Sequence, residues 1–580
     1  MAVNRNFRTC PATGLLFHEP AEKLMRWNAV VAVVALLVGG LLAIGVLLTR
    51  WQAVHLLAPD TFYQFLTAHG LNMLVYWIIF FEIAILYFAS STLLRCRLAA
   101  PGMAWAGFWM MVAGALLNNY SVLRGDSSVM FTSYAPMGAH PTFYLGLILF
   151  AVGALIGCFV FFGTLVVAKD EKTYRGSVPL VTFGAITAAI IAVFTIAAGA
   201  IILIPTFLWS VGLIEHIDSL MYRTIWWGFG HSSQQINVSA HVAVWYAGAA
   251  IVFGAKPMSE KVSRTAFLLY IFFLQLASAH HLLADPGLTS NWKIFNTSYA
   301  MYLAVLASMV HGLTVPGSIE VAQRLKGYNN GLFEWLRKAP WDNAPFVAIF
   351  ISIIVFGFLG GISGVMMGTE QLNLIIHNTL YVPGHFHATV ATGTTLAFMG
   401  LTYFLIPVMF RREIAFGKLA IWQVYIFGLS MAGLSLFMMG AGTLGAPRRH
   451  WDISFAGNAF AHEFPGTAWL MITLMAICGL GALLGGAMYL AITVWSVFLG
   501  RKIQTPEFNY VPAKAGVAPA PQPAAQPSTV SATLTSHHGG IGAAGMIAPG
   551  TFVLALVFLT SFVLYYFVNW KYLSTVWPLK

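Results

Sequence analysis

The sequence predicts an all-α polytopic membrane protein, and three observations carry that prediction. Of its 580 residues, 59% are hydrophobic and only 8% are charged, whereas soluble domains carry about 25% charged residues. The hydrophobic residues form runs of about 20 residues or more, the length that a helix needs to cross a bilayer. No run alternates as a membrane β-strand does. This composition excludes an ordinary soluble enzyme and an intrinsically disordered chain.

Each long apolar run is predicted to be a membrane-spanning helix. Several runs exceed 25 residues, which implies tilted helices or helices that extend beyond the bilayer. The first twelve are predicted to form one helical body, residues 27–510, after a cytoplasmic N-terminal segment, residues 1–26. The thirteen runs cover residues 27–49, 62–94, 102–123, 142–168, 178–213, 225–254, 265–284, 294–316, 344–367, 373–410, 419–442, 466–499 and 549–570.

A different kind of segment separates the twelfth run from the thirteenth. Residues 511–547 are rich in Ala, Pro, Ser and Gly, a composition typical of a flexible linker. The last apolar run lies within residues 548–580. We therefore expect a twelve-helix bundle with a thirteenth transmembrane helix appended to it.

The net charge of +11 would suggest a nucleic-acid partner on a soluble protein, but its distribution fits membrane topology. With a cytoplasmic N-terminus, 22 of the 30 Lys and Arg residues lie on the inner side and 8 on the outer side, as the positive-inside rule requires. We expect a multi-pass protein of a bacterial or archaeal plasma membrane, surrounded by lipid and without nucleic acid. The four cysteines are widely separated and suggest neither a metal site nor disulfides.

Histidines gather at one predicted depth, near the outer ends of four of these helices. His69 lies early in the run 62–94, and His231 lies early in the run 225–254. The pair His280–His281 lies near the end of the run 265–284, and His385 and His387 lie in GHFH of the run 373–410. Because ionisable residues inside a membrane are rare and usually functional, we interpret the six as ligands.

Spacing restricts what these histidines can bind. Positions i and i+2 of a helix point about 200° apart, so His385 and His387 are predicted to serve two different centres on opposite faces of one helix. Two planar cofactors flanking that helix would satisfy this arrangement. A single intramembrane histidine such as His69 or His311 can instead be a hydrogen-bonding residue between helices.

These motifs resemble those of subunit I of the haem–copper oxidase superfamily. HNTLYVPGHFH, HHLLADPG and GAPRR are closest in spelling to its B branch, and the resemblance covers about residues 20–500. The tail, residues 548–580, resembles the separate one-helix subunit of B-branch oxidases. The resemblance implies a respiratory redox enzyme built on the subunit I bundle.

The resemblance also implies ligand roles. His69 and His387 would be the axial pair of a low-spin haem, and His385 the proximal ligand of a high-spin haem. His231, His280 and His281 would bind a second metal, copper or non-haem iron, because three imidazoles suit either. The haem type, a or b, stays open.

Three outer residues would accompany the haems by the same resemblance. Arg448 and Arg449 would pair with propionates as bidentate donors, and His377 would lie close to them. Two solvated arginines and a structural histidine are the alternatives. Asn373 stands where the family has an acid, so the site of proton exit is left open.

One departure from the family concerns the active site. Family oxidases carry a Tyr four residues after the first metal histidine, and here that position is Gln235. A second branch uses a Tyr six residues before the paired histidines, here Leu274. Tyr270 and Tyr246 are not in equivalent places. Two metals supply three of the four electrons that split O₂, and glutamine cannot supply the fourth.

Reduction of two NO molecules to N₂O takes only two electrons, so Gln235 favours a nitric oxide reductase, with an O₂-reducing and proton-translocating cytochrome c oxidase as the alternative. Nitric oxide reductases also place glutamates beside non-haem iron. Here the nearest acids are Glu82 and Glu215, and their position is open.

Protons and electrons must also reach the site. Ser308, His311 and Thr314 form a polar stripe at i, i+3 and i+6, where the B branch has its proton path; interhelical hydrogen bonding is the alternative.

Without a CxxCH or dicopper motif, the chain needs a partner that supplies electrons. We expect a subunit II with a cupredoxin or cytochrome domain, fed by cytochrome c, another periplasmic donor or quinol. A secondary transporter and a haem-bearing sensor are the competing classes.

Overall fold

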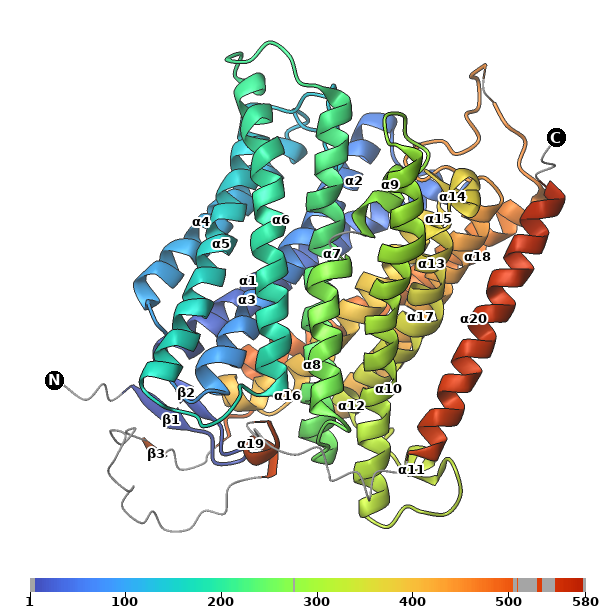
Figure 1. Ribbon diagram of the computed structural model, residues 1–580. Helices are drawn as coiled ribbons and strands as arrows, with labels where there is room; N and C mark the ends of the chain where they lie inside the picture. The colour runs from blue at the N-terminus through green and yellow to red at the C-terminus, as the bar shows by residue number, and fades with distance from the viewer. Residues whose placement is uncertain are drawn as a thin grey trace.

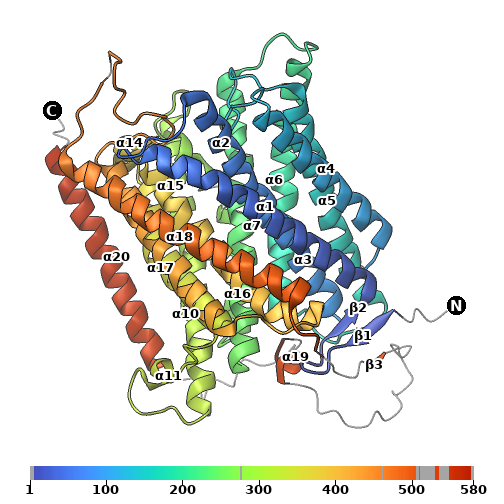
Figure 2. The same ribbon diagram turned by 180° about the vertical axis from the view of Figure 1, so that it is seen from behind.

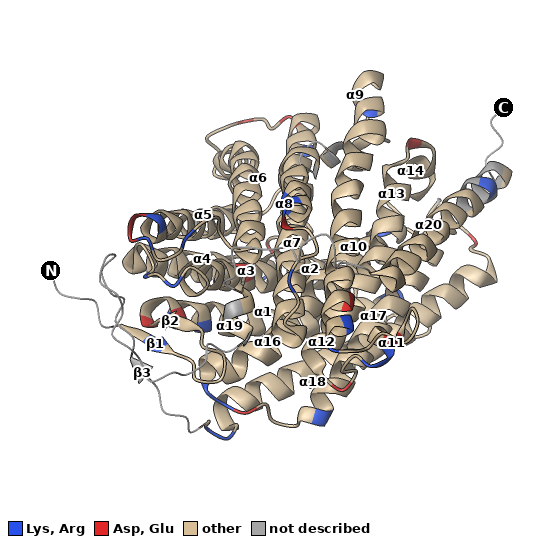
Figure 3. Ribbon diagram, turned by 60° about the horizontal axis from the view of Figure 1, so that its bottom comes forward, with Lys and Arg blue, Asp and Glu red and all other residues tan. Residues whose placement is uncertain are grey.

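The computed structural model describes residues 6–274, 277–459, 461–503, 508–509, 529–534 and 548–576. It is a bundle of long helices that lie side by side and span the molecule from one end to the other (Figure 1). One end carries a small sheet of β1 (Phe7–Thr9), β2 (Leu16–His18) and β3 (Phe508–Asn509), in the order β2-β1-β3 with antiparallel pairs. Many Lys and Arg residues lie in loops and helix ends of that same end (Figure 3), which we expect to be cytoplasmic.

The first half of the bundle consists mostly of long helices. Proline starts several of them, because its missing N–H is not needed in the first turn. The helices are α1 (Glu19–Arg50), α2 (Pro59–Leu71), α3 (Trp77–Tyr87), α4 (Pro101–Leu123), α5 (Pro141–Asp170), α6 (Leu180–Ser210) and α7 (Ser219–Phe253), with π-helical turns η1 (Asn72–Tyr76) and η2 (Phe88–Thr92) around α3. Helix α1 starts at Glu19, ahead of the apolar run that begins at residue 27.

The second half is more often interrupted. Its elements are α8 (Glu260–Leu269), η3 (Tyr270–Leu274), η4 (Ala277–Leu282), α9 (Ser290–Phe295), η5 (Asn296–Ala300), α10 (Met301–Leu325), α11 (Glu334–Arg337), α12 (Ala344–Val355), η6 (Phe356–Gly361), α13 (Ile362–Gly368), α14 (Glu370–Ile376), α15 (Tyr381–Phe386), η7 (His387–Thr395), α16 (Leu396–Leu405), η8 (Ile406–Phe410), α17 (Gly417–Thr443), α18 (Gly466–Leu499), α19 (Thr529–Leu534) and α20 (Pro549–Val576).

Eleven helices of the described part are long and apolar enough to cross a membrane, against the thirteen predicted. Helix α4 is formed as expected but is not among the eleven. The predicted span 265–284 is divided into α8, η3 and η4, with residues 275–276 outside the described part. Of the predicted linker 511–547, only α19 is described.

The predicted helix 373–410 is also wrong at its start. Helix α14 ends at Ile376, and Asn378 has a positive φ of 58° that no helix continues. The chain becomes helical again at Tyr381, where Pro383 falls in the first turn, which tolerates its missing N–H. His377 therefore lies in a short connection, and His385 and His387 lie beyond it.

Candidate metal centre and cofactor cavity

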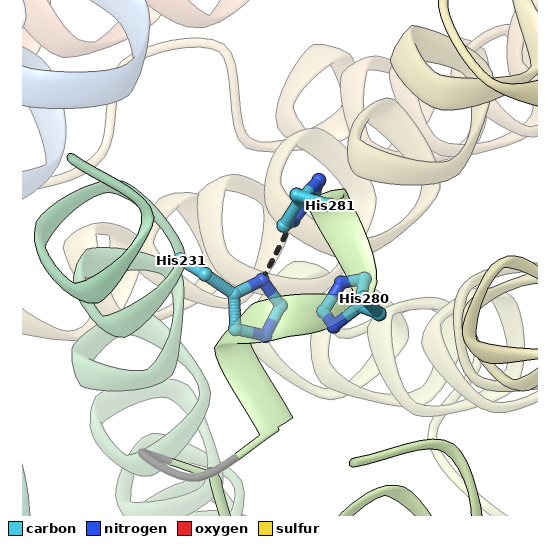
Figure 4. A group of neighbouring side chains, drawn as sticks. All are labelled: His231, His280 and His281. Atoms are coloured by element: carbon cyan, nitrogen blue, oxygen red, sulfur yellow. Dashed lines mark hydrogen bonds between the residues drawn. The ribbon is translucent and has the colours of Figure 1, made fainter. Parts of the chain in front are cut away.

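Three histidine side chains converge at a single point between α7 and η4. His231 comes from α7, and His280 and His281 come from η4; one nitrogen of each lies within 4.8 Å of the others (Figure 4). His231 Nδ1 lies 2.9 Å from His281 Nε2, within hydrogen-bond distance. It is the one such group among the described residues. Convergent imidazole nitrogens are the donors that copper, iron and zinc prefer.

Tryptophans and a glycine position this triad. The Trp227 ring stacks on His281 with ring centroids 3.6 Å apart. Gly230, directly before His231, has no space for a side chain, because a Cβ would lie 1.9 Å from the Trp226 ring. The segment IWWGFGH thus supplies both the candidate ligand His231 and the tryptophan rings that pack beside the triad.

Gln235 lies one turn after His231 on α7. Its side chain is 3% exposed, and its Oε1 has no hydrogen-bond partner among the described residues. A buried carbonyl oxygen without a donor is costly, so this position suits a water molecule or a ligand that can donate a hydrogen bond to Oε1.

His385 is held on α15 by residues of α13. Its Nδ1 lies 2.9 Å from Ser363 Oγ, which leaves Nε2 as the atom available to a metal. Gly364 makes room for the ring, since a Cβ there would lie 2.9 Å from His385 Cε1. Helix α13 also packs against η4, which carries His280 and His281, so His385 belongs to the same neighbourhood as the triad.

His69 and His387 face a separate cavity. His69 Nδ1 donates to the carbonyl of Gly39 at 2.9 Å, and His387 Nδ1 donates to that of Pro383 at 2.7 Å. Because a carbonyl can only accept, both rings have their second nitrogen, Nε2, free for a metal. Both rings line an apolar cavity of about 330 Å³ between α1, α2, η7, α17 and α18.

Arg448 and Arg449 lie at the wall of that cavity. Their loop is fixed to the chain before α15, because Leu380 N–H donates to Ala446 O at 2.7 Å and Arg448 N–H donates to Asn378 O at 3.0 Å. Burial, with Arg449 nearby, lowers the pKa of Arg448 to about 9. Arg449 Nη2 is buried without an acceptor among the described residues.

Arg448 also lines a second, small cavity of about 10 Å³ beside His281. His377 lies there with Nε2 3.9 Å from Asp285 Oδ1, and Asp285 pairs with Arg223. Burial lowers the pKa of His377 to about 4, with Asp285 opposing and the arginines adding to the shift. The sequence did not predict a role for Asp285, although it follows the histidine pair in HHLLADPG. Asp285 provides an acid beside His377, whereas Asn373 stands where the family has one.

The structure joins Ser308, His311 and Thr314 to two tyrosines. Tyr246 Oη lies 3.0 Å from His311 Nδ1 and 2.6 Å from Thr314 Oγ1, and Tyr270 Oη lies 3.0 Å from Ser308 Oγ. The Tyr270 ring is 5.4 Å from the His311 ring. Tyr246 is not where the family carries its active-site tyrosine, yet it connects two residues of this stripe, His311 and Thr314.

Comparison with known proteins gives one consistent result. Residues 23–484 match the family model described as Cytochrome C and Quinol oxidase polypeptide I. The chain is 32% identical over 441 residues to cytochrome c oxidase subunit 1 of Thermus thermophilus, which covers 73% of this chain and 76% of that protein. It is 23% identical over 431 residues to ubiquinol oxidase subunit 1 of Acetobacter aceti, covering 68% and 59%.

The chain belongs to the haem–copper oxidase subunit I family. Among solved structures, a heme-copper terminal oxidase dimer superposes with a TM-score of 0.78 at 24% identity, covering 93% of this chain and 92% of that one, which supports the fold.

The chain is thus the catalytic subunit of a haem–copper terminal oxidase, a multi-pass oxidoreductase of a respiratory chain that works within an oxidase complex. The family implies haems and a copper site, for which the histidine triad is available. The preference for NO is not supported, since the matched relatives are named oxidases.

Proposed function

We propose that this subunit reduces O₂ to water between a high-spin haem on His385 and a copper ion on His231, His280 and His281. The observation that carries the proposal is the triad itself, with three nitrogens converging near His385. When bound, the iron and the copper supply the gas-binding position and electrons. A low-spin haem on His69 and His387 would deliver those electrons. Because the spelling of its motifs resembles that of the B branch, we also propose that the enzyme belongs to that branch.

The side chains present fit these groups. At the larger cavity, His69 and His387 each have Nε2 available, and the cavity walls are apolar. Arg448 and Arg449 are half-buried cations that have no carboxylate partner among the described residues, and such cations are stabilised by anions. Haem propionates would provide them. Trp227 Nε1, Asn373 Oδ1 and His377 Nε2 are further buried polar atoms without hydrogen-bond partners in the described part.

Protons would reach the site along α10. Thr314, Tyr246 and His311 are connected by hydrogen bonds, and Ser308 and Tyr270 continue the series one turn further toward the end that holds the triad. A chain of hydroxyl and imidazole groups can pass protons by successive donation. The same groups would otherwise be expensive to bury in a membrane.

Gln235 favours a second candidate function, the reduction of NO to N₂O. Its amide can donate to a bound ligand but cannot be oxidised, so the fourth electron for O₂ must come from elsewhere. We assign that role to Tyr270, whose buried hydroxyl can release its proton to Ser308 as the ring is oxidised.

The electron donor is a subunit II with a cupredoxin or cytochrome domain that receives electrons from cytochrome c or another periplasmic carrier.

The test is to purify the complex, supply one reductant, and compare O₂ consumption with N₂O formation from NO. The proposal expects rapid O₂ uptake with water as the product, and strong loss of this uptake in Tyr270→Phe. Rapid N₂O formation with little O₂ uptake would overturn it in favour of NO reduction.

A further inference from the structure

Glu320 is a buried carboxylate that has no part in the proposed chemistry. It lies on α10 and is fully buried. Its Oε1 accepts from Arg324 Nε at 2.8 Å and from the backbone N–H of Gly550 at 3.0 Å, and its Oε2 accepts from the N–H of Thr551 at 2.6 Å. Two of its three hydrogen bonds therefore go to the first turn of the terminal helix α20.

These two hydrogen bonds have a physical reason. The first N–H groups of a helix have no acceptor within the helix, and that end carries a partial positive charge. A carboxylate is the strongest acceptor a protein offers, and charge-assisted hydrogen bonds exceed neutral ones. Glu320 and the start of α20 thus satisfy each other in a place where either alone would be costly to bury.

The residues around Glu320 form a seat that admits glycine only. A Cβ on Gly550 would lie 2.1 Å from the carbonyl oxygen of Leu332 and 2.6 Å from Trp335 Nε1. The loop that carries Leu332 is itself fixed, because Arg324 also donates to Gly331 O at 3.0 Å. One ion pair, Glu320 with Arg324, therefore organises both the acceptor and the wall.

Further along, α20 supports the segment that carries His385. It runs beside α10, η6 and α13 (Figures 1 and 2). Phe558 packs edge-on against Phe358 at 5.1 Å, and Tyr565 is hydrogen-bonded to Tyr381, one turn before His385 on α15. A helix rises 1.5 Å per residue. The position of Gly550 along the bundle therefore sets the position of Tyr565 relative to Tyr381.

We propose that Glu320, Leu332 and Trp335 form a recognition site for the N-terminus of a single membrane helix with glycine in its first turn. Docking at this site, rather than the covalent connection through residues 511–547, holds α20 on the bundle and steadies the stretch from Tyr381 to His385. The bundle and α20 thus behave as two subunits that one chain supplies together. The inference does not depend on which gas the enzyme reduces.

The test uses the full chain with a protease site inserted between residues 511 and 528. After cleavage in detergent, we expect α20 to remain with the bundle during gel filtration. Gly550→Ala should release it at least tenfold faster, and Glu320→Gln should do so too. Gly312→Ala, where a Cβ on α10 meets nothing within 4 Å, and Glu413→Gln, an exposed acid, are the matched controls.

Gly550→Ala leaves every residue of the bundle unchanged, so the test does not depend on whether the Glu320 variant folds. Hydrogen exchange supplies the second readout: the amides of residues 381–386 should exchange faster once α20 has left. Release of α20 from the cleaved parent protein as fast as from Gly550→Ala would overturn the recognition site. Unchanged exchange at 381–386 after release would overturn the supporting role.

Discussion

The two histidine sites of this molecule are built in opposite ways. The triad brings three nitrogens within 4.8 Å, and two of its rings lie within hydrogen-bond distance of each other. His69 and His387 instead line an apolar cavity of about 330 Å³, and each ring is fixed by a backbone carbonyl. A small ion needs converging donors, whereas a large planar cofactor needs separated donors and an apolar space. From this contrast we propose a metal ion for the first site and a haem for the second.

Removing one ligand from each site is the most severe test of this contrast. His280→Ala should lose the second metal and nearly all activity while retaining the low-spin haem spectrum. His69→Ala should lose the low-spin haem and retain the metal, because no described residue is shared between the triad and the cavity that holds His69. Metal analysis and pyridine haemochrome spectra of both purified variants decide this. Loss of both cofactors in either variant would contradict the division.

The hydrogen-bonded stripe on α10 should serve only the triad. Tyr246→Phe removes the hydroxyl between His311 and Thr314 and should slow turnover about 10²-fold, the lower end of the range typical of a lost proton-transfer group. Reduction of the low-spin haem should keep its rate. Stopped-flow spectra separate the two steps. Tyr403→Phe, which removes a buried hydroxyl bonded to Gln423, is the control, and equal slowing in both would refute the path.

A glycine substitution tests how closely the protein packs around His385. Gly364→Ala would place a Cβ 2.9 Å from His385 Cε1 and should shift the iron–histidine vibration of the high-spin haem, with turnover lower by about tenfold, as for other groups that orient metal ligands. Gly102→Ala, on α4 and outside the lining of both sites, meets nothing within 4 Å and should change neither. Resonance Raman spectra of the two variants are the measurement.

Much of this arrangement was predictable because membrane helices and intramembrane histidines are strong sequence signals. Most of the spans and the positions of the six histidines follow from hydropathy and spacing, and the structure brings His231, His280 and His281 together. The break at His377 was not predictable from hydropathy, which does not register the positive φ of Asn378. Tyr246 and Asp285 were missed because their roles depend on contacts between elements far apart in the chain.

Composition also gave no hint of how α20 is attached. Its apolar run predicts a helix, but the partner of its first turn is Glu320, 230 residues away. Gln235 shows the opposite limit. Its identity is read directly from the sequence, but a single replaced side chain does not decide the substrate. The family match covers residues 23–484 and favours O₂ over NO.

The smallest predicted effect lies far from both sites. His18, 2% exposed, accepts a hydrogen bond from Leu98 N–H at 3.1 Å and ties the N-terminal sheet to the loop before α4. Burial, aided by Arg97, lowers the pKa of His18 from 6.5 to about 4. The unfolded chain therefore binds more protons between these values, so this contribution to stability is complete above about pH 6.5 and is lost as the pH falls toward 4.

His18→Gln keeps an acceptor that does not titrate, and it should flatten the decline in melting temperature between pH 7 and pH 5 by an amount of the order of a degree. Thermal unfolding at several pH values measures the difference, and the spectrum of the low-spin haem should not change. Equal pH profiles for parent and variant would show that the His18–Leu98 contact contributes nothing. A changed haem spectrum would show instead that the sheet and the cavity are coupled, and the two histidine sites would then not be as independent as their construction implies.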